Sequence, residues 1–156
     1  MANAREILAA ALGSFRKAGL PCDVFGGWAE ELLGLRPPWQ HADIDLVYRG
    51  DSLAAFDAIG GEFIPVPAKR FRHKRAFLFR GTLCEIILVR EADAAPVTMF
   101  WGDMPFSWDR PLLHHEPLNI CGEQATIVSA ANLEKYRRLH RQMQPDRWQD
   151  PASLEP

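Results

Sequence analysis

The sequence predicts an α/β (α+β) domain in which a small mixed β-sheet is flanked by helices, with one helix near the C-terminus. Helical and strand-like patterns interleave along the chain, which favours a layered mixed fold. The length of 156 residues fits a single domain, 1–156, and 47% hydrophobic with 24% charged residues is typical of globular proteins. We expect a core over about residues 3–143 and a loose, polar tail over residues 144–156.

Apolar residues recur at helical spacing in two long segments, residues 3–18 and 129–143. Two shorter helices are predicted over residues 28–33 and 51–59, and Asp51 is placed to cap the second of these. Between them, strands are predicted where β-branched and aromatic residues cluster. These are Cys22–Phe25, Ile44–Tyr48, Phe63–Val66, Ala76–Phe79 and Thr82–Val89. We expect irregular structure over most of residues 91–117, which are rich in Pro, Trp and Phe.

Charge and cysteine content exclude several classes of protein. The net charge of −2 and the pI near 6.2 give no global attraction to nucleic acid or to an anionic membrane, so any anion site must be local. No apolar run approaches the roughly 20 residues of a membrane helix, and the N-terminal segment does not resemble a secretory signal. The three cysteines are far apart, and two of them lie in apolar stretches typical of a core. We therefore expect a cytoplasmic protein with no membrane partner.

Two acids and a glycine pair carry the chemical signal. Asp43 and Asp45 are two residues apart at a predicted strand start, so both carboxylates project from one face. They repel unless a cation joins them, and Mg²⁺ prefers such hard oxygen ligands. Gly26-Gly27 lies between a strand and a helix, where backbone can approach phosphate oxygens. Alone, the acids could be a solvated strand end and the glycines a turn; together they are more specific.

These residues form a longer pattern: G-G-W-A at 26–29, Leu33-Gly34, Arg36, and H-A-D-I-D-L at 41–46. The pattern resembles the small antibiotic nucleotidyltransferases, chiefly the aminoglycoside 2″-nucleotidyltransferase and lincosamide nucleotidyltransferase group of the polymerase β-like superfamily. The likeness covers residues 24–48 and extends to about residue 89. It implies the nucleotidyltransferase fold and a Mg²⁺-dependent transfer of a nucleoside monophosphate from an NTP, such as ATP, to a hydroxyl. The acceptor would be a small molecule, for example an aminoglycoside or lincosamide antibiotic, and pyrophosphate would be released.

The resemblance assigns the nucleotide site to the first part of this pattern. Gly26 and Gly27 would hold the phosphates, Arg36 is the nearby cation, and His41 would orient the first aspartate. Trp39 and its neighbour stand where related proteins carry another basic residue. An alternative is therefore a nucleotide-binding or regulatory protein that retains the fold without turnover.

The resemblance also implies a set of three carboxylates. Asp43 and Asp45 would bind Mg²⁺, and Glu85 on a later strand would complete the metal site or accept the hydroxyl proton. Glu85 is a lone acid in an apolar strand, where acids are rarely buried without a partner. Its surroundings would raise its pKa unless a metal or another cation lies near it. The alternative is a residue that faces solvent at a sheet edge.

Residues 69–75 hold five permanent cations. They could bind the triphosphate, a polyanionic acceptor or RNA, but we favour a solvated hairpin for most of them, with one or two reaching the site. An RNA- or protein-directed nucleotidyltransferase thus stays a second alternative, although a nucleic-acid partner is not favoured. The cations of the last helix, Arg137 among them, are expected on its solvated face.

Four aromatic residues, Phe100, Trp101, Phe106 and Trp108, lie close together in the segment expected to be irregular. They could line an acceptor pocket, form the interface of a homodimer, or belong to a loop packed over the core. The sequence does not choose among these three.

Overall fold

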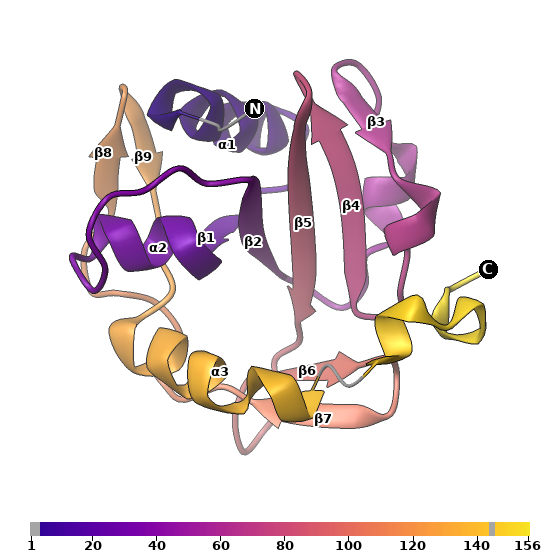
Figure 1. Ribbon diagram of the computed structural model, residues 1–156. Coiled ribbons are helices and arrows are strands. Elements are labelled where there is room, and N and C mark those ends of the chain that lie inside the picture. The colour runs from indigo at the N-terminus through magenta and orange to yellow at the C-terminus, as the bar shows by residue number, and fades with distance from the viewer. Residues whose placement is uncertain (1–3, 144–145) are drawn as a thin grey trace.

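The computed structural model describes residues 4–143 and 146–156, and its centre is a five-stranded sheet (Figure 1). The strands are β1 (Asp23–Phe25), β2 (Asp43–Arg49), β3 (Phe63–Pro65), β4 (Lys74–Phe79) and β5 (Thr82–Val89). Their order across the sheet is β1-β2-β5-β4-β3. The β2–β5 pair is parallel and the other pairs are antiparallel, which confirms the predicted mixed sheet.

Three α-helices accompany the sheet: α1 (Arg5–Lys17), α2 (Gly26–Leu32) and α3 (Ala130–Met143). All three were predicted, although residue 3, the expected start of the first helix, lies outside the described residues. On α1 the Phe15 ring is fully buried and stacks on Phe63, with 4.2 Å between ring centroids. It also meets Phe77 edge to face at 6.3 Å. This aromatic contact packs α1 against one face of the sheet.

The two faces of the sheet differ because strand side chains alternate. On β2 and β5 the residues Ile44, Leu46, Cys84 and Ile86 are fully buried and share one face. The alternate positions on the other face include the three acids of the predicted site, at 43, 45 and 85. One face of these strands thus supplies the core, and the first residues of the opposite face carry the acids, ahead of the buried Val47 and Ile87.

Two segments differ from the prediction. The expected helix over residues 51–59 is only a 3-10 helix, Ala54–Ala58, and it lacks a side-chain cap because Leu53, not Asp51, precedes it. Residues 91–117 contain a hairpin of β6 (Val97–Phe100) and β7 (Met104–Ser107), and a further hairpin, β8 (Leu118–Ile120) with β9 (Glu123–Ala125), follows. The four aromatics of residues 100–108 are at most 6% exposed, so they pack in the core. Their burial stabilises strands too short to be recognised from alternation.

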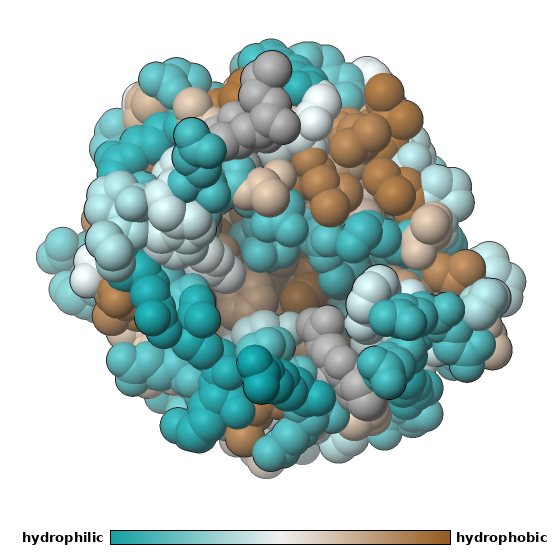
Figure 2. Space-filling view, viewed as in Figure 1, coloured by the Kyte–Doolittle hydropathy of each residue, from teal (hydrophilic) through white to brown (hydrophobic). Residues whose placement is uncertain are grey.

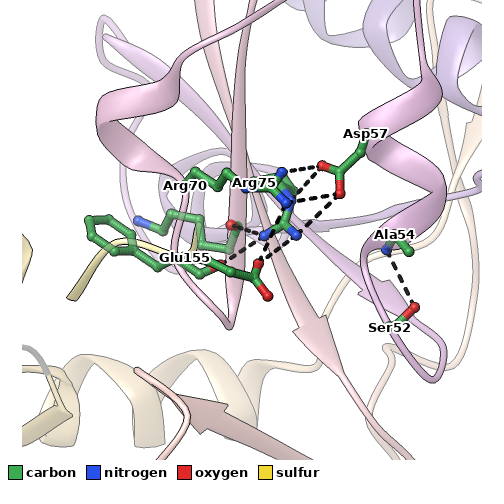
Figure 3. A network of polar contacts seen from close by, with 8 residues as sticks. Ser52, Ala54, Asp57, Arg70, Arg75 and Glu155 are labelled. Carbon is green, nitrogen blue, oxygen red and sulfur yellow. Dashed lines mark hydrogen bonds and ion pairs between the residues drawn. The ribbon is translucent and has the colours of Figure 1, made fainter. Parts of the chain in front are cut away.

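The described part of the tail also packs, which differs from the loose tail that we expected. Residues 146–149 and 151–153 are 3-10 helices, and Leu154 pairs with Phe71 as an isolated bridge. Figure 3 shows the polar contacts that hold the last residues: Glu155 accepts from Arg75 at 2.6 Å. The buried Arg75 guanidinium requires carboxylate partners, and the tail provides one.

Across the described ranges, the structure contains no helix with the length and apolar character required to cross a membrane. Cys22 and Cys84 are buried, as their apolar surroundings predicted, and Cys121 is exposed.

Candidate active site

The sheet register brings the three predicted acids together. Asp45 on β2 lies directly opposite Glu85 on β5, and Asp43 is two residues earlier on the same face. Partner residues of adjacent strands share a face, so all three carboxylates point to one side of the sheet. Asp43 and Asp45 are half-buried, and Glu85 is 8% exposed. The alternative of a solvent-facing Glu85 is therefore wrong.

Crowding of negative charge changes how the aspartates ionise. Burial, together with the carboxylates of Asp43 and Glu85, raises the pKa of Asp45 to about 7. Burial and Glu85 also raise the pKa of Asp43, although Lys69 and Lys74 oppose this shift. An acid pair with raised pKa values gains stability from a nearby cation.

Glu85 is already satisfied by two cations from the basic run. Lys69 Nζ donates to Glu85 Oε1 at 3.0 Å, and the Lys74 ammonium donates to Oε2. Burial alone would raise the pKa of Glu85, but Lys74 and Lys69 hold it below its usual value. The condition under which we expected a raised pKa is thus not met, and Glu85 is ionised at neutral pH.

The contacts of Glu85 with the two lysines affect the predicted metal site of three carboxylates. Among residues 4–143 and 146–156, no three His, Cys, Asp or Glu side chains are arranged to hold a metal ion. The predicted set of three carboxylates is therefore not assembled as a metal site in this conformation, since Glu85 binds lysines instead. Asp43 and Asp45 still fit a divalent cation, because they offer hard oxygen donors on one strand face and both pKa values are raised.

The glycine pair is fixed by packing against this acid cluster. Gly26 has φ +62°, and a Cβ built there would lie 2.5 Å from Asp45 Oδ2. A Cβ on Gly27 would lie 2.9 Å from the Trp39 ring and 3.1 Å from His41 Nδ1. Any larger residue would displace these groups, so the glycines let β2 and the 34–42 loop close around the start of α2.

The other two predicted nucleotide residues lie on this loop. The His41 ring is 4% exposed and lies between Trp28 and Trp39, with centroids 4.1 and 4.2 Å away. Its Nε2 is 3.0 Å from Glu31 Oε1. The Arg36 side chain is 47% exposed, and its Nε is 3.5 Å from Glu30 Oε2. His41 thus helps to build the loop, whereas Arg36 reaches Glu30.

A cavity of about 190 Å³ adjoins the glycines, between α2 and α3. Gly26, Gly27, Glu30 and Arg137 contribute to its wall. Arg137 Nη2 donates to Glu30 Oε1 at 2.5 Å, while half of the Arg137 side chain stays exposed, as expected for the solvated face of α3. Two arginines therefore accompany one carboxylate, and they hold the pKa of Glu30 low although burial opposes this. Nothing in the sequence of α3 signals this role, because it depends on how α3 packs on α2.

A second cavity, of about 540 Å³, lies on the β4 side of the carboxylates. Glu85, Lys69 and Lys74 form its polar wall, and Trp101 and Trp148 form part of its apolar wall. Since the strand order is β1-β2-β5-β4, the acids of β2 and β5 separate the two cavities. Figure 2 shows a hollow at the centre of this face, with hydrophobic atoms in its floor and a largely hydrophilic rim.

Comparison with known proteins adds a structural likeness. No protein-family model and no curated protein matches the chain. The antibiotic-resistance factor ANT(2″)-Ia superposes with a TM-score of 0.65 at 18% identity, over 91% of this chain and 74% of that one. The chain has the nucleotidyltransferase fold. Lincomycin-bound LnuA, a lincosamide adenylyltransferase, matches at 0.65 with 12% identity over 87% of each chain. ANT(2″)-Ia in complex with adenylyl-2″-tobramycin matches at 0.59 with 17% identity, over 98% and 82%.

Proposed function

We propose that the protein is a Mg²⁺-dependent nucleotidyltransferase, which moves a nucleoside monophosphate from an NTP to a hydroxyl of a small molecule. The observation that carries the proposal is the acid pair, Asp43 and Asp45, packed against Gly26 at the centre of a nucleotidyltransferase fold. The similar structures support a small-molecule acceptor, since one contains adenylyl-2″-tobramycin and another contains lincomycin.

The nucleotide occupies the side of the site that carries the glycines. Gly26 and Gly27 line the smaller cavity at the start of α2, and their backbone can approach phosphate oxygens there because they carry no side chain. Arg36 and Arg137 supply two positive charges against the single carboxylate of Glu30, which leaves an excess that suits a polyphosphate. Asp43 and Asp45 would hold Mg²⁺, which neutralises charge on the phosphates when it is bound.

In the transfer step, the acceptor hydroxyl oxygen forms a bond to the α-phosphorus. The bond from that phosphorus to the bridging oxygen of the β-phosphate breaks, and pyrophosphate leaves with the electron pair. Glu85 accepts the hydroxyl proton: it is ionised, and it faces the larger cavity from which an acceptor would approach. Placement of the two reactants on either side of the acids provides the in-line geometry.

Calorimetry tests the binding half of this proposal. Mg²⁺ and ATP should bind together and far more weakly apart, because the acid pair and the triphosphate repel each other. Asp43→Asn should remove this dependence, and Asp51→Asn, an exposed acid outside the site, is the matched control. Equal affinity for ATP in EDTA would exclude the metal role. Transfer is then screened with labelled NTPs and a panel of hydroxyl acceptors.

One observation favours a second candidate, nucleotide binding without turnover. Both oxygens of Glu85 are engaged by Lys69 and Lys74, which restrains the proposed base. The two candidates differ in one result. Binding of Mg²⁺-ATP with no pyrophosphate release for any acceptor would support the regulatory protein.

A further inference from the structure

We propose that the acceptor is a hydroxyl compound that carries an anionic group on a flat, apolar ring, and not a polycation of the aminoglycoside type. The inference rests on the proposed function, since it concerns the acceptor side of that site. It comes from the larger cavity, whose volume of about 540 Å³ is in the range of small-molecule sites.

Charge is the first argument. The charged residues that line this cavity are Lys69, Lys74 and Glu85, so two ammonium groups face one carboxylate. An ammonium group has three donors, and the contact with Glu85 uses one on each lysine. The Lys69 side chain is 42% exposed and can therefore turn a donor to a ligand. Because Mg²⁺ would offset the charges of Asp43 and Asp45, which also interact with these lysines, an anion would complete this wall, whereas a polycation would meet like charge.

Shape is the second argument. Trp148 is 55% exposed at the cavity, and Trp101 and Phe71 meet edge to face with 4.8 Å between their centroids. Exposed tryptophan beside buried aromatics offers a stacking surface for a flat ring. The tail that carries Trp148 is fastened by the contact of Glu155 with Arg75, which Figure 3 shows. The aromatic wall is thus held in place and does not depend on a loose end.

The position of the cavity distinguishes an acceptor from the nucleotide. The glycines and Arg137 line the smaller cavity, and the acids lie between the two. Glu85 borders the larger cavity, so a hydroxyl there would reach the proposed base. The competing assignment gives the two lysines to the phosphates of the NTP, and the experiment below separates the two.

The test uses three probes with the same ring and the same hydroxymethyl group. These are para-(hydroxymethyl)benzoate, the neutral para-(hydroxymethyl)benzamide and the cationic para-(aminomethyl)benzyl alcohol. Affinity is measured by calorimetry and tryptophan fluorescence in the presence of Mg²⁺ and a non-hydrolysable ATP analogue, and transfer is measured by pyrophosphate release with ATP. We expect affinity to fall from benzoate to amide to amine, with about tenfold between the two charged probes.

Variants locate the effect. Lys69→Gln should weaken benzoate binding about fivefold and leave the amide unchanged. Lys17→Gln, an exposed lysine of α1 that does not line this cavity, should change neither. Trp148→Ala should weaken all three probes. Because Lys69 and Trp148 are well exposed, both variants should fold.

Two outcomes would overturn the inference. One is preference for the amine, or for tobramycin as acceptor. The other is a Lys69→Gln protein that loses ATP affinity but keeps benzoate affinity, which would assign the lysines to the nucleotide. Failure of the proposed function looks different: the order of probe binding would hold, and pyrophosphate would not be released with any acceptor. That result would support the anion preference and reject the transfer reaction.

Discussion

The lysines and the arginines of the basic run at residues 69–75 contact different parts of the protein. Lys69 and Lys74 turn to the acid cluster and bind Glu85, whereas Arg70 and Arg75 turn to Asp57 and the C-terminal tail (Figure 3). Lys74 and Arg75 are neighbours on β4, so alternation along the strand sends them to opposite faces. A cluster that reads as one feature in the sequence is thus divided by the sheet.

The residue types match the two tasks. A guanidinium is a planar fork that suits fixed carboxylate pairs, and Arg75 contacts both Asp57 and Glu155 while only 7% of its side chain is exposed. An ammonium is a point charge on a flexible stem, which suits a wall that must admit a ligand. Four cations of the run therefore have acid partners, which does not favour an RNA-binding surface. Most of these cations are paired with acids instead of solvated as we expected, and two of them, Lys69 and Lys74, contact the predicted site residue Glu85.

The largest expected effect is a loss of transfer rate when an aspartate beside the two lysines is substituted. Asp43→Asn or Asp45→Asn should lower the rate of nucleotide transfer by a factor of about 10² to 10³, because a ligand of the Mg²⁺ that would neutralise the reacting phosphates is lost. Pyrophosphate release under saturating Mg²⁺-ATP measures this, with Asp51→Asn as the exposed control. A variant with wild-type rate and unchanged melting would place the metal elsewhere.

Glu85→Gln should show whether Glu85 acts as the general base or as a metal ligand. The amide keeps the shape of the side chain but cannot accept the proton, so turnover should fall by about 10² or more while Mg²⁺-ATP binding persists. The two lysines would lose their ionised partner. Parallel calorimetry and rate measurements decide the role: loss of both binding and turnover would make Glu85 a metal ligand, and an unchanged rate would remove it from the site.

Substitution of an arginine of the run should lower the free energy of unfolding and leave the rate of transfer unchanged. Arg75→Met removes a buried cation and leaves Asp57 and Glu155 with fewer partners, which should cost about 1–3 kcal/mol of unfolding free energy. Arg80→Met, which breaks an exposed pair with Glu62, should cost less than about 1 kcal/mol. Urea unfolding compares the two. If Arg75→Met were as mild as the control, the tail would not be fastened by this contact.

The sequence predicted this site as far as local pattern reaches. The acids are two apart on one strand, and the glycines precede a helix, so Asp43, Asp45 and Gly26 could be placed without the fold. The contact between Gly26 and Asp45 depends on β1 pairing with β2, which no local pattern records. The parallel register of Asp45 and Glu85 confirms a relation that only the resemblance had suggested.

The rest of the site depends on tertiary contacts that no local pattern records. Arg137 joins the site because α3 packs against α2, and its spacing on α3 is that of any solvated residue. Trp148 reaches the larger cavity because the tail returns to β4. The short hairpins of residues 97–107 and 118–125 were missed for a related reason, since three- or four-residue strands hold too few alternations to recognise.

The smallest expected effect concerns the pH dependence of stability without metal. The pKa of Asp45 is about 7 in the folded protein, well above its usual value, because of burial and the carboxylates of Asp43 and Glu85. Between about pH 4 and pH 7 the folded state therefore holds a proton that the unfolded state has released, so stability falls as the pH rises through this window. Glu85 has the opposite sign: its lowered pKa adds stability that is lost on acidification.

Asp45→Asn should remove the loss of stability that the wild type shows as the pH rises. In EDTA the variant should match the wild type near pH 5 and be more stable than the wild type near pH 8, as measured by urea unfolding. Mg²⁺ should then raise the stability of the wild type at the higher pH and leave the variant unchanged, because only the wild type retains both carboxylates of the acid pair. Parallel pH curves for the two proteins would mean that Asp45 is compensated within the fold. Asp43 and Asp45 would then not differ from Glu85, which already binds two lysines, in how well their charges are compensated.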